Sequence, residues 1–410
     1  MKGRGMKKGL IILTAALLIA GCQKKTGGPM FADDVRFLEK YTKVIVLKAA
    51  DGQARIAVCP EYQGRIMTST AGGDEGLSFG WINREFIAAG QINLKMSAYG
   101  GEDRFWLGPE GGQFSIFFKK GSSFDFDHWA TPAPINSEPY EAASVGEDRV
   151  LLRHRMSLTN YSDAVFNLNL ERELRVLDAE SAVADLGLKS DPGLKGVAFQ
   201  SSNTVTNGGK TAWKKETGLV SMWILGMFNP SPAVTVVIPF KRGIEAELGP
   251  MVRDTYFGKV PSDRLIVKDG VMFFRCDGQW RSKIGLTPKR CVPLVGSYDA
   301  LNRVLTLVRF SLPDSPAPYV NSLWELQKNP FDGDAVNSYN DGSPGPGQKP
   351  MGPFYELESS SPGAELKPGE SLTHLHRTFH FQGDESALDA IARKTLGVGL
   401  DEIKSVFGKR

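Results

Sequence analysis

The sequence predicts an all-β protein built as an antiparallel sandwich with short peripheral helices. The chain has 410 residues, of which 41% are hydrophobic, so it can bury a large core. Its 45 glycines and 24 prolines accompany many short apolar runs that turn residues separate, a pattern typical of sheet proteins. Helical periodicity is confined to the two edges of the chain. We therefore expect residues 31–410 to form one β domain.

The expected strands alternate apolar with polar residues. The segments from Arg149 to Leu158 and from Phe166 to Val176 both follow a period of two. Such strands have one covered face and one wetter face, which suits an antiparallel sandwich. Helices are expected at Phe31–Tyr41 and at Ser386–Leu396, where Asp384 can cap the second helix.

The first 22 residues have the features of an export signal. A basic start and an apolar run from Leu10 to Ala20 precede small residues and Cys22. The run is shorter than the roughly 20 residues that a membrane-spanning helix needs. Residues 1–21 are therefore expected to be a signal peptide.

The segment Ile19-Ala20-Gly21-Cys22 resembles the bacterial lipobox, in which the cysteine is acylated and the leader is cut before it. This resemblance makes Cys22 the expected lipidation site and residues 22–30 a short tether. Each buried CH₂ of an acyl chain contributes about 0.8 kcal/mol, so the lipid alone would hold the protein at the membrane. By resemblance to other lipoproteins, Gln23 indicates the outer membrane of a Gram-negative cell envelope. The alternative is an ordinary secreted protein with a chance cysteine.

The charge balance argues against nucleic acid as a partner. The chain has 49 Lys and Arg residues against 46 Asp and Glu residues, a net charge of +3, and four of the basic residues lie in the leader. The mature protein is therefore near neutral. It has no basic field that would neutralise a run of phosphates.

A cluster of acids and imidazoles is predicted near the end of the chain. Glu356 and Glu358 alternate with apolar residues in one expected strand, and His374 and His376 do so in the next. If these strands are antiparallel neighbours with their apolar faces buried together, all four side chains share one face.

Three interpretations of this cluster stay open. It is an acid–base set with Glu358 as base and His376 as acid, a divalent metal site, or a hydrogen-bonded structural network. No cofactor is predicted, and a divalent metal is kept as the alternative.

The loop expected from Tyr99 to Gly112 carries candidate sugar-binding side chains. Glu102, Arg104, Trp106 and Glu110 combine an aromatic face with charged groups, as a pyranose site requires. In the alternative interpretation, Arg104 and Glu110 form a structural ion pair and Trp106 belongs to the core.

Two asparagines complete the expected substrate-binding residues. Asn340 lies in a second expected loop, which begins at Asn337 and runs past Gly342 through SPGPGQKPMGP to Pro353, and long loops of this kind are commonly functional or disordered. Asn203 lies in the stretch from Gln200 to Asn207. A side-chain amide can both donate and accept hydrogen bonds.

The segment LKPGESLTH, with the acidic strand before it, resembles the carboxy-terminal end of the galactose mutarotase-like superfamily, and GRIMTS near Arg65 resembles its early strand. More closely, GGEDRFWLGPEGG, SSNTVTN, VNSYNDG and FYELESSSPGAELKPGE resemble a family of uncharacterised bacterial lipoproteins in that superfamily. The resemblance implies a large antiparallel β-supersandwich whose concave sheet holds a carbohydrate.

The resemblance also implies a reaction. In the aldose epimerases of this superfamily, a glutamate and a histidine exchange protons with the sugar, and Glu356 or Glu358 stands near the place of that glutamate. The epimerases carry a central N-H-x-Y-F-N-type motif, whereas residues 200–207 here contain no histidine. Two functions are therefore expected as alternatives: acid–base conversion of a sugar or glycoside, and binding of a glycan without turnover.

Overall fold

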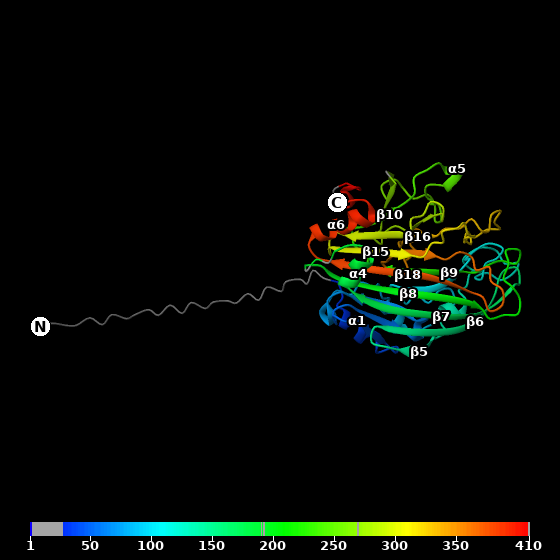
Figure 1. Cartoon of the computed structure of the whole chain (residues 1–410), viewed down its shortest axis with the longest axis horizontal. Coiled ribbons are helices and arrows are strands. Elements are labelled where there is room, and N and C mark those ends of the chain that lie inside the picture. Colours follow the sequence, from blue (N-terminus) through cyan, green and yellow to red (C-terminus); the bar gives the residue numbers. More distant parts are fainter. Residues whose placement is uncertain (2–27, 190, 192, 269, 409–410) are drawn as a thin grey trace.

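The computed structural model describes residues 1, 28–189, 191, 193–268 and 270–408, which form three antiparallel sheets with short helices at their margins (Figure 1). This architecture confirms the predicted all-β class. Cys22 and nearly all of the expected signal peptide fall within residues 2–27, outside the described residues. In the part of the chain that is described, no helix has both the length and the apolar character needed to cross a membrane.

The largest sheet has ten strands and supplies one layer of the sandwich. In spatial order, the strands are β11 (Leu265–Lys268), β12 (Val271–Arg275), β10 (Val234–Pro239), β14 (Leu294–Asp299), β15 (Val304–Phe310), β18 (Ser371–Gln382), β8 (Lys195–Asn207), β7 (Val165–Asp178), β6 (Arg149–Thr159) and β5 (Glu141–Val145). The two predicted alternating segments form β6 and β7. Most of their apolar residues are buried and most of the residues between them are exposed.

The second layer consists of two smaller sheets. One contains β13 (Ser282–Leu286), β16 (Val336–Asn340), β17 (Tyr355–Ser360), β9 (Ser221–Phe228) and β4 (Arg104–Gly108), and the other contains β1 (Ile45–Lys48), β2 (Arg55–Cys59) and β3 (Arg65–Thr70). A backbone bridge between Ile66 and Asp103 links the two sheets. Part of the core lies between the layers, where Leu357 of β17 belongs to the same cluster as Val295 and Val308 of the large sheet.

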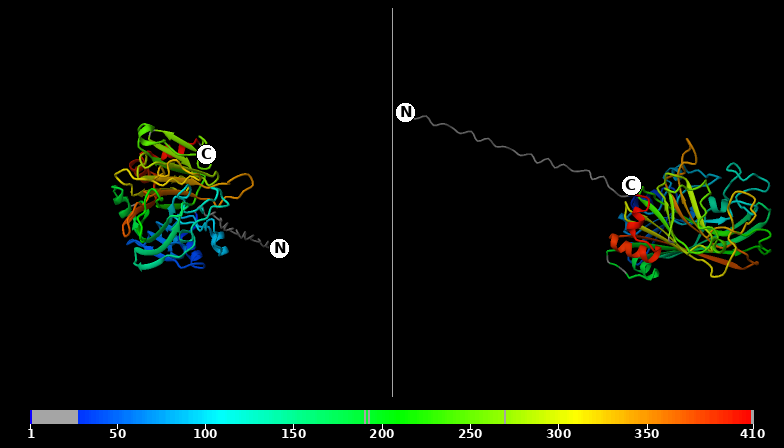
Figure 2. Two further views of the ribbon diagram at one scale, coloured as in Figure 1. Left: turned by 90° about the vertical axis from the view of Figure 1, so that its right-hand side faces the viewer. Right: turned by 90° about the horizontal axis from the view of Figure 1, so that it is seen from above.

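The helices lie at the margins of the sheets. They are α1 (Phe31–Leu38), α2 (Arg84–Ala89), α3 (Ala133–Asn136), α4 (Ala179–Asp185), α5 (Glu245–Leu248), α6 (Glu385–Leu396) and α7 (Leu400–Ser405). Helices α4, α6 and α7 pack together with the large sheet around Phe379 and Phe381 (Figure 2). Both predicted helices are present, but the first ends at Leu38. Asp384 occupies the N-cap position of α6 without a side-chain capping hydrogen bond, so the predicted cap is wrong in that detail.

The two predicted loops each contain a strand. Arg104–Gly108 is the edge strand β4, and Val336–Asn340 is the internal strand β16. The glycines and polar residues of these segments led to the prediction of loops. A strand that is covered on both faces shows no simple alternation of apolar and polar residues, so the strands could not be recognised by their period. All five residues of each strand are buried.

The predicted pairing of the two late strands is wrong. β17 lies between β16 and β9, whereas β18 lies between β15 and β8 in the other layer. The two strands face each other across the core, where Ser359 Oγ lies 2.8 Å from both His374 Nε2 and His376 Nδ1. Because successive residues of a strand point to opposite faces, Glu358 and Glu356 point away from the histidines.

Candidate functional site

Charged side chains gather on the face of the five-stranded sheet that is turned away from the large sheet. One residue of β9 lies directly opposite both Arg104 of β4 and Glu358 of β17. In a neighbouring row, Tyr339 of β16 lies opposite both Glu356 of β17 and Lys283 of β13. Directly opposed residues share a face of the sheet. We define the charged face by four side chains: Arg104, Lys283, Glu356 and Glu358.

Glu358 lies at the centre of the charged face. Its Oε2 accepts hydrogen bonds from Trp223 Nε1 at 2.8 Å and from Lys283 Nζ at 2.9 Å. Its Oε1 is buried and has no hydrogen-bond partner among the described residues. Glu358 therefore presents one oriented carboxylate oxygen that the protein leaves unused.

The second carboxyl on β17 has a different environment. Arg104 Nη2 donates to Glu356 Oε1 at 3.1 Å. Burial raises the pKa of Glu356 to about 8; the guanidinium of Arg104 opposes this shift, and the neighbouring carboxylate of Glu358 adds to it. Glu356 therefore holds a proton more readily than an exposed glutamate does.

The cations and a third carboxyl complete the electrostatics of the face. Burial lowers the pKa of Arg104, although the nearby glutamates oppose the shift. Burial also disfavours the charged form of Lys283, but Glu358, Glu110 and Glu356 together raise its pKa above the ordinary value. Burial raises the pKa of Glu110 to about 7, against the pull of Lys283. Glu110 is thus coupled electrostatically to Lys283 and Glu358.

Trp106 is not an open platform for a sugar. It is 2% exposed and contacts the rings of Phe117 and Trp223. The guanidinium of Arg104 lies 4.2 Å from the centre of its ring and covers one face. The alternative interpretation of Trp106 as a core residue is the one that agrees with this packing.

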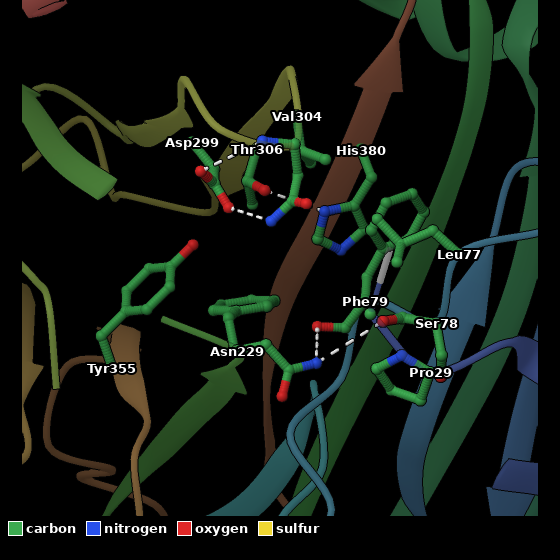
Figure 3. Close-up of a pocket in the computed structure, with 13 residues that line it drawn as sticks. Pro29, Leu77, Ser78, Phe79, Asn229, Asp299, Val304, Thr306, Tyr355 and His380 are labelled. Atoms are coloured by element: carbon green, nitrogen blue, oxygen red, sulfur yellow. Dashed lines mark hydrogen bonds between the residues drawn. The ribbon is translucent and has the colours of Figure 1, made fainter. Parts of the chain in front are cut away.

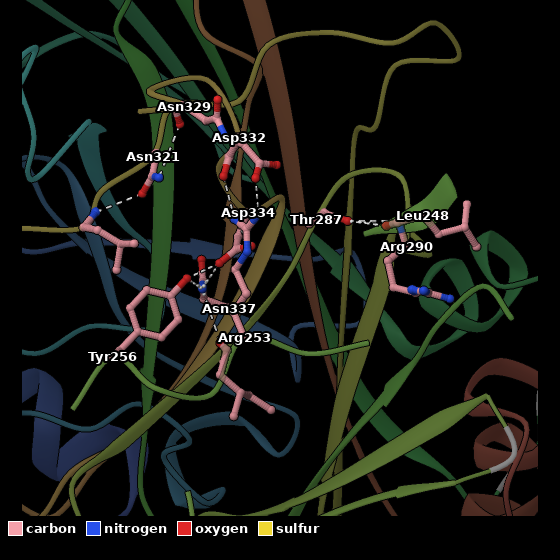
Figure 4. A network of polar contacts seen from close by, with 12 residues as sticks. Leu248, Arg253, Tyr256, Thr287, Arg290, Asn321, Asn329, Asp332, Asp334 and Asn337 are labelled. Carbon is pink, nitrogen blue, oxygen red and sulfur yellow. Dashed lines mark hydrogen bonds and ion pairs between the residues drawn. The ribbon is translucent and has the colours of Figure 1, made fainter. Parts of the chain in front are cut away.

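A polar network joins Arg253, Tyr256, Asp334 and Asn337 (Figure 4). Arg253 pairs with Asp334 at 3.1 Å, and the hydroxyl of Tyr256 donates to the same carboxylate. Asn337 Nδ2 donates to Asp334 Oδ2 at 3.3 Å. The ring of Tyr256 in turn lies 5.7 Å from Lys283 Nζ. Sequence reasoning missed these residues because they come from separate segments that share no motif.

The two predicted histidines lie in the core. Both are fully buried, and burial lowers the pKa of His374 to about 3 and that of His376 to about 4. His374 Nδ1 also lies 3.0 Å from Ser311 Oγ. These imidazoles are neutral at physiological pH and are separated from Glu358 by the sheet itself, so the four predicted residues form neither one acid–base set nor one ligand set. In the described ranges, no group of three or more His, Cys, Asp or Glu side chains could hold a metal ion.

Three further predicted residues have their polar atoms engaged within the protein. Glu102, Asn203 and Asn340 are fully buried. Glu102 is hydrogen-bonded to the backbone and hydroxyl of Ser69 and to the ring of His380. Asn203 is hydrogen-bonded to Arg172 and to the backbone of His374. Asn340 is hydrogen-bonded to the backbones of Gly278 and Trp280. The polar atoms of these side chains form hydrogen bonds inside the protein and are not available to a ligand at the charged face.

A pocket lies elsewhere, beside His380 (Figure 3). His380 Nδ1 lies 2.9 Å from Thr306 Oγ1, and its Nε2 lies 2.7 Å from Glu102 Oε2. The hydroxyl of Tyr355 lies 2.9 Å from that of Ser297. These polar groups already form hydrogen bonds within the protein, whereas Glu358 Oε1 on the charged face has no hydrogen-bond partner among the described residues. We therefore take the charged face as the candidate site.

Comparisons with known proteins give a family and similar solved structures. The model of a family of unknown function, DUF6786, matches residues 29–407. A search of curated proteins found no match. The Slr1438 protein from Synechocystis sp. PCC 6803 is 12% identical, with 84% of this chain and 96% of that chain covered and a TM-score of 0.49.

Two further solved structures carry mutarotase names. A galactose mutarotase-like protein from Lactobacillus casei ATCC 334 is 9% identical, with 83% of this chain and 100% of that chain covered and a TM-score of 0.46. A galactose mutarotase related enzyme from Lactobacillus acidophilus is 10% identical, with 83% and 97% covered and a TM-score of 0.43.

Proposed function

The chain belongs to a family of unknown function, DUF6786. From its own residues, we propose that the charged face binds a carbohydrate and transfers protons at the sugar ring. Four features support this proposal: the carboxylate of Glu358, a second carboxyl whose pKa burial raises, and two cations beside them. Pairs of titratable groups whose environments separate their protonation states are typical of acid–base sites.

The observation that carries the proposal is the unused oxygen of Glu358. Leaving a buried carboxylate oxygen without a donor costs about 1–3 kcal/mol or more, comparable to a lost hydrogen bond. The oxygen is fully buried, and Lys283 and Trp223 fix the orientation of the carboxylate through its other oxygen. A sugar hydroxyl would supply the missing donor.

The proposed reaction is proton exchange at an anomeric centre. Glu358 Oε1 accepts the proton of the anomeric hydroxyl while Glu356 donates its proton to the ring oxygen, and the bond between the anomeric carbon and the ring oxygen breaks. Ring closure on the other face of the carbonyl returns both protons and leaves the enzyme unchanged. Glu356 thereby takes the role of acid that the sequence pattern assigned to His376. Lys283 pairs with Glu358, and Arg104 orients Glu356.

The second candidate function is binding of a glycan without turnover. It is favoured by the two ion pairs on the charged face, Arg104 with Glu356 and Lys283 with Glu358. Each cation holds the carboxyl that proton transfer would use. The same face would then only bind hydroxyl groups.

Anomeric exchange measured by NMR tests the proposal. We expect the wild-type protein to accelerate the exchange of at least one aldose above the buffer rate. Measurable glycan affinity without acceleration would leave only the binding function. Neither acceleration nor affinity across a panel of aldoses and their glycosides would contradict the proposal.

The raised pKa of Glu356 makes stability depend on pH. The folded state holds this proton more tightly than the unfolded state, so the associated stabilisation is complete below the ordinary value of 4.5 and is lost as the pH rises to about 8. Glu356→Gln carries no such proton. We therefore expect the Tm of the variant, relative to that of the wild type, to rise between these two pH values and then to level off.

Thermal melts of both proteins at intervals from pH 4 to pH 9 measure this difference. Glu365→Gln, an exposed carboxyl on the surface, is the matched control and should parallel the wild type. Parallel profiles for Glu356→Gln and the wild type would contradict the raised pKa of Glu356.

The proposal also includes attachment of the protein to the outer membrane through a lipid on Cys22. Cys22→Ala is expected to move the protein from the membrane fraction to the soluble fraction, because no acyl chain could then be attached. Fractionation followed by immunoblotting measures this shift, with Lys24→Ala as the control. Retention of Cys22→Ala in membranes would overturn the lipid anchor.

A further inference from the structure

Arg281 is a cation beside the charged face whose hydrogen-bond donors are unused. Its side chain is partly exposed, and its guanidinium lies 3.9 Å from the centre of the Phe257 ring. Among the described residues, no side chain or backbone group forms a hydrogen bond or an ion pair with this guanidinium. Arg104 and Lys283, in contrast, each pair with a glutamate. A guanidinium has five N–H donors in a planar fork, so Arg281 can offer its donors to a ligand.

The position of Arg281 continues the rows of the charged face. Glu358 stands in the first row. The second row holds Glu356, Tyr339 and Lys283, which lie opposite one another on adjacent strands. Arg281 precedes Lys283 by two residues, a step of about 6.6 Å along an extended chain, and alternate residues of such a chain share a face. Arg281 therefore begins a third row beside the second.

Contacts of the Arg281 side chain agree with this position. The ring of Phe257, which the guanidinium covers, also contacts the ring of Tyr339 at 5.8 Å between centroids. Burial raises the pKa of Glu110 to about 7 and also raises that of Asp341, and Arg281 is among the groups that oppose both shifts. The guanidinium thus lies on the side of the sheet that carries the charged face.

The neighbouring acidic groups leave Arg281 without a direct ion pair. The oxygens of Asp341 accept hydrogen bonds from the hydroxyl of Tyr339 and from the backbone nitrogen of Gly352, both at 2.9 Å. Arg281 is therefore a single cation with two acidic neighbours, Asp341 and Glu110. This arrangement suits a ligand group with one negative charge, because a doubly charged phosphate would be repelled more strongly by the two acids.

The order of the three rows matches the order of the groups in a sugar acid. In a pyranose, the ring oxygen links the anomeric carbon to C5, and in a uronic acid C5 carries a carboxylate. A ligand with its anomeric hydroxyl at Glu358 and its ring oxygen at Glu356 can place this carboxylate at Arg281. A carboxylate accepts two parallel N–H donors from one guanidinium.

We propose that Arg281 binds a carboxylate of the ligand, so that the preferred ligand is an acidic sugar of the uronic acid class rather than a neutral aldose. Arg281 thereby determines specificity, while the glutamates exchange protons with the sugar. This proposal rests on the proposed function, because it specifies the substrate class of the same site.

Calorimetric affinities of the full-length protein are measured for matched pairs of a neutral aldose and its uronic acid, such as glucose with glucuronate and galactose with galacturonate. We expect the wild type to bind at least one uronate more tightly than its aldose. Arg281→Gln should lower the affinity for that uronate by about 10–100-fold, the usual contribution of hydrogen bonds to a charged group, and leave the aldose affinity unchanged. Arg281→Lys keeps the charge but not the planar fork, so it should keep only part of the preference.

Arg155→Gln is the matched control, because Arg155 is exposed on β6 in the other layer, and it should keep both affinities. A wild type that prefers neutral aldoses, sugar phosphates or sugar sulfates to uronates would overturn the Arg281 proposal and leave the proposed function standing. An unchanged uronate affinity in Arg281→Gln, or an equal loss for aldose and uronate, would also overturn it. A wild type that binds neither aldoses nor their acids would instead contradict the proposed function.

Discussion

Replacing Glu358 by Gln is expected to lower the rate of anomeric exchange by about 10²–10⁴-fold, the usual contribution of a positioned general base. The amide has nearly the volume of the carboxyl and still offers an oxygen to Trp223 Nε1, which lies 2.8 Å from the native Oε2. It cannot accept the proton of the hydroxyl. Lys283 keeps Glu110 and Glu356 as nearby acidic groups, so we expect the variant to fold.

The exchange rate is measured by NMR on the aldose that the wild type turns over fastest. Glu365→Gln serves as the control, because Glu365 lies on the surface and pairs only loosely with Lys215, at 3.9 Å. The control is expected to keep the wild-type rate. If Glu358→Gln also kept it, Glu358 would not be the base. Loss of glycan affinity without any exchange activity in the wild type would support the binding function.

Replacing Arg172 by Ala is expected to destabilise the protein by about 3–5 kcal/mol, the usual cost of breaking a buried ion pair from one side. Arg172 and Asp103 are both fully buried and form an ion pair between the layers. Arg172 Nη1 also donates to Asn203 Oδ1 at 2.6 Å, and its Nε donates to Gly64 O at 3.2 Å. The variant leaves the carboxylate of Asp103 without its cation.

Equilibrium unfolding in urea measures this loss. Arg153→Ala is the matched control, because Arg153 lies on the adjacent strand β6 and pairs with Glu171 on the surface, where both side chains are about half exposed. Exposed pairs of this kind contribute about 0–1 kcal/mol. Similar losses of unfolding free energy in the two variants would show that the buried pair of Arg172 and Asp103 contributes no more to stability than the exposed pair.

The long strands β6 and β7 of the large sheet could be predicted because their environment has a period of two. β6 and β7 bury nearly every second residue and expose most of the others, so the alternation is visible in the sequence. One inward position of β7 carries a charged residue. Arg172 stands at an inward position of β7 and is fully buried. Only the partner across the core, Asp103, explains it.

The candidate site could be predicted only in part. Arg104 was expected in a sugar-binding loop and Glu356 and Glu358 in an acid–base cluster, and the structure places these three side chains on one face. Lys283 and Tyr256 could not be predicted, because they come from segments with no recognisable pattern and meet the glutamates only through strand order and a loop contact.

The sequence by itself determined the β class, the faces of the long strands and which residues of a single strand point the same way, because alternation along an extended chain is a local property. It did not determine which strands are neighbours. The ten residues between β17 and β18 can connect strands within one sheet or cross between layers, and packing of the whole core selects between these paths. Tertiary structure alone therefore decided that the glutamates face Arg104 and Lys283, while the histidines face Ser359 in the interior.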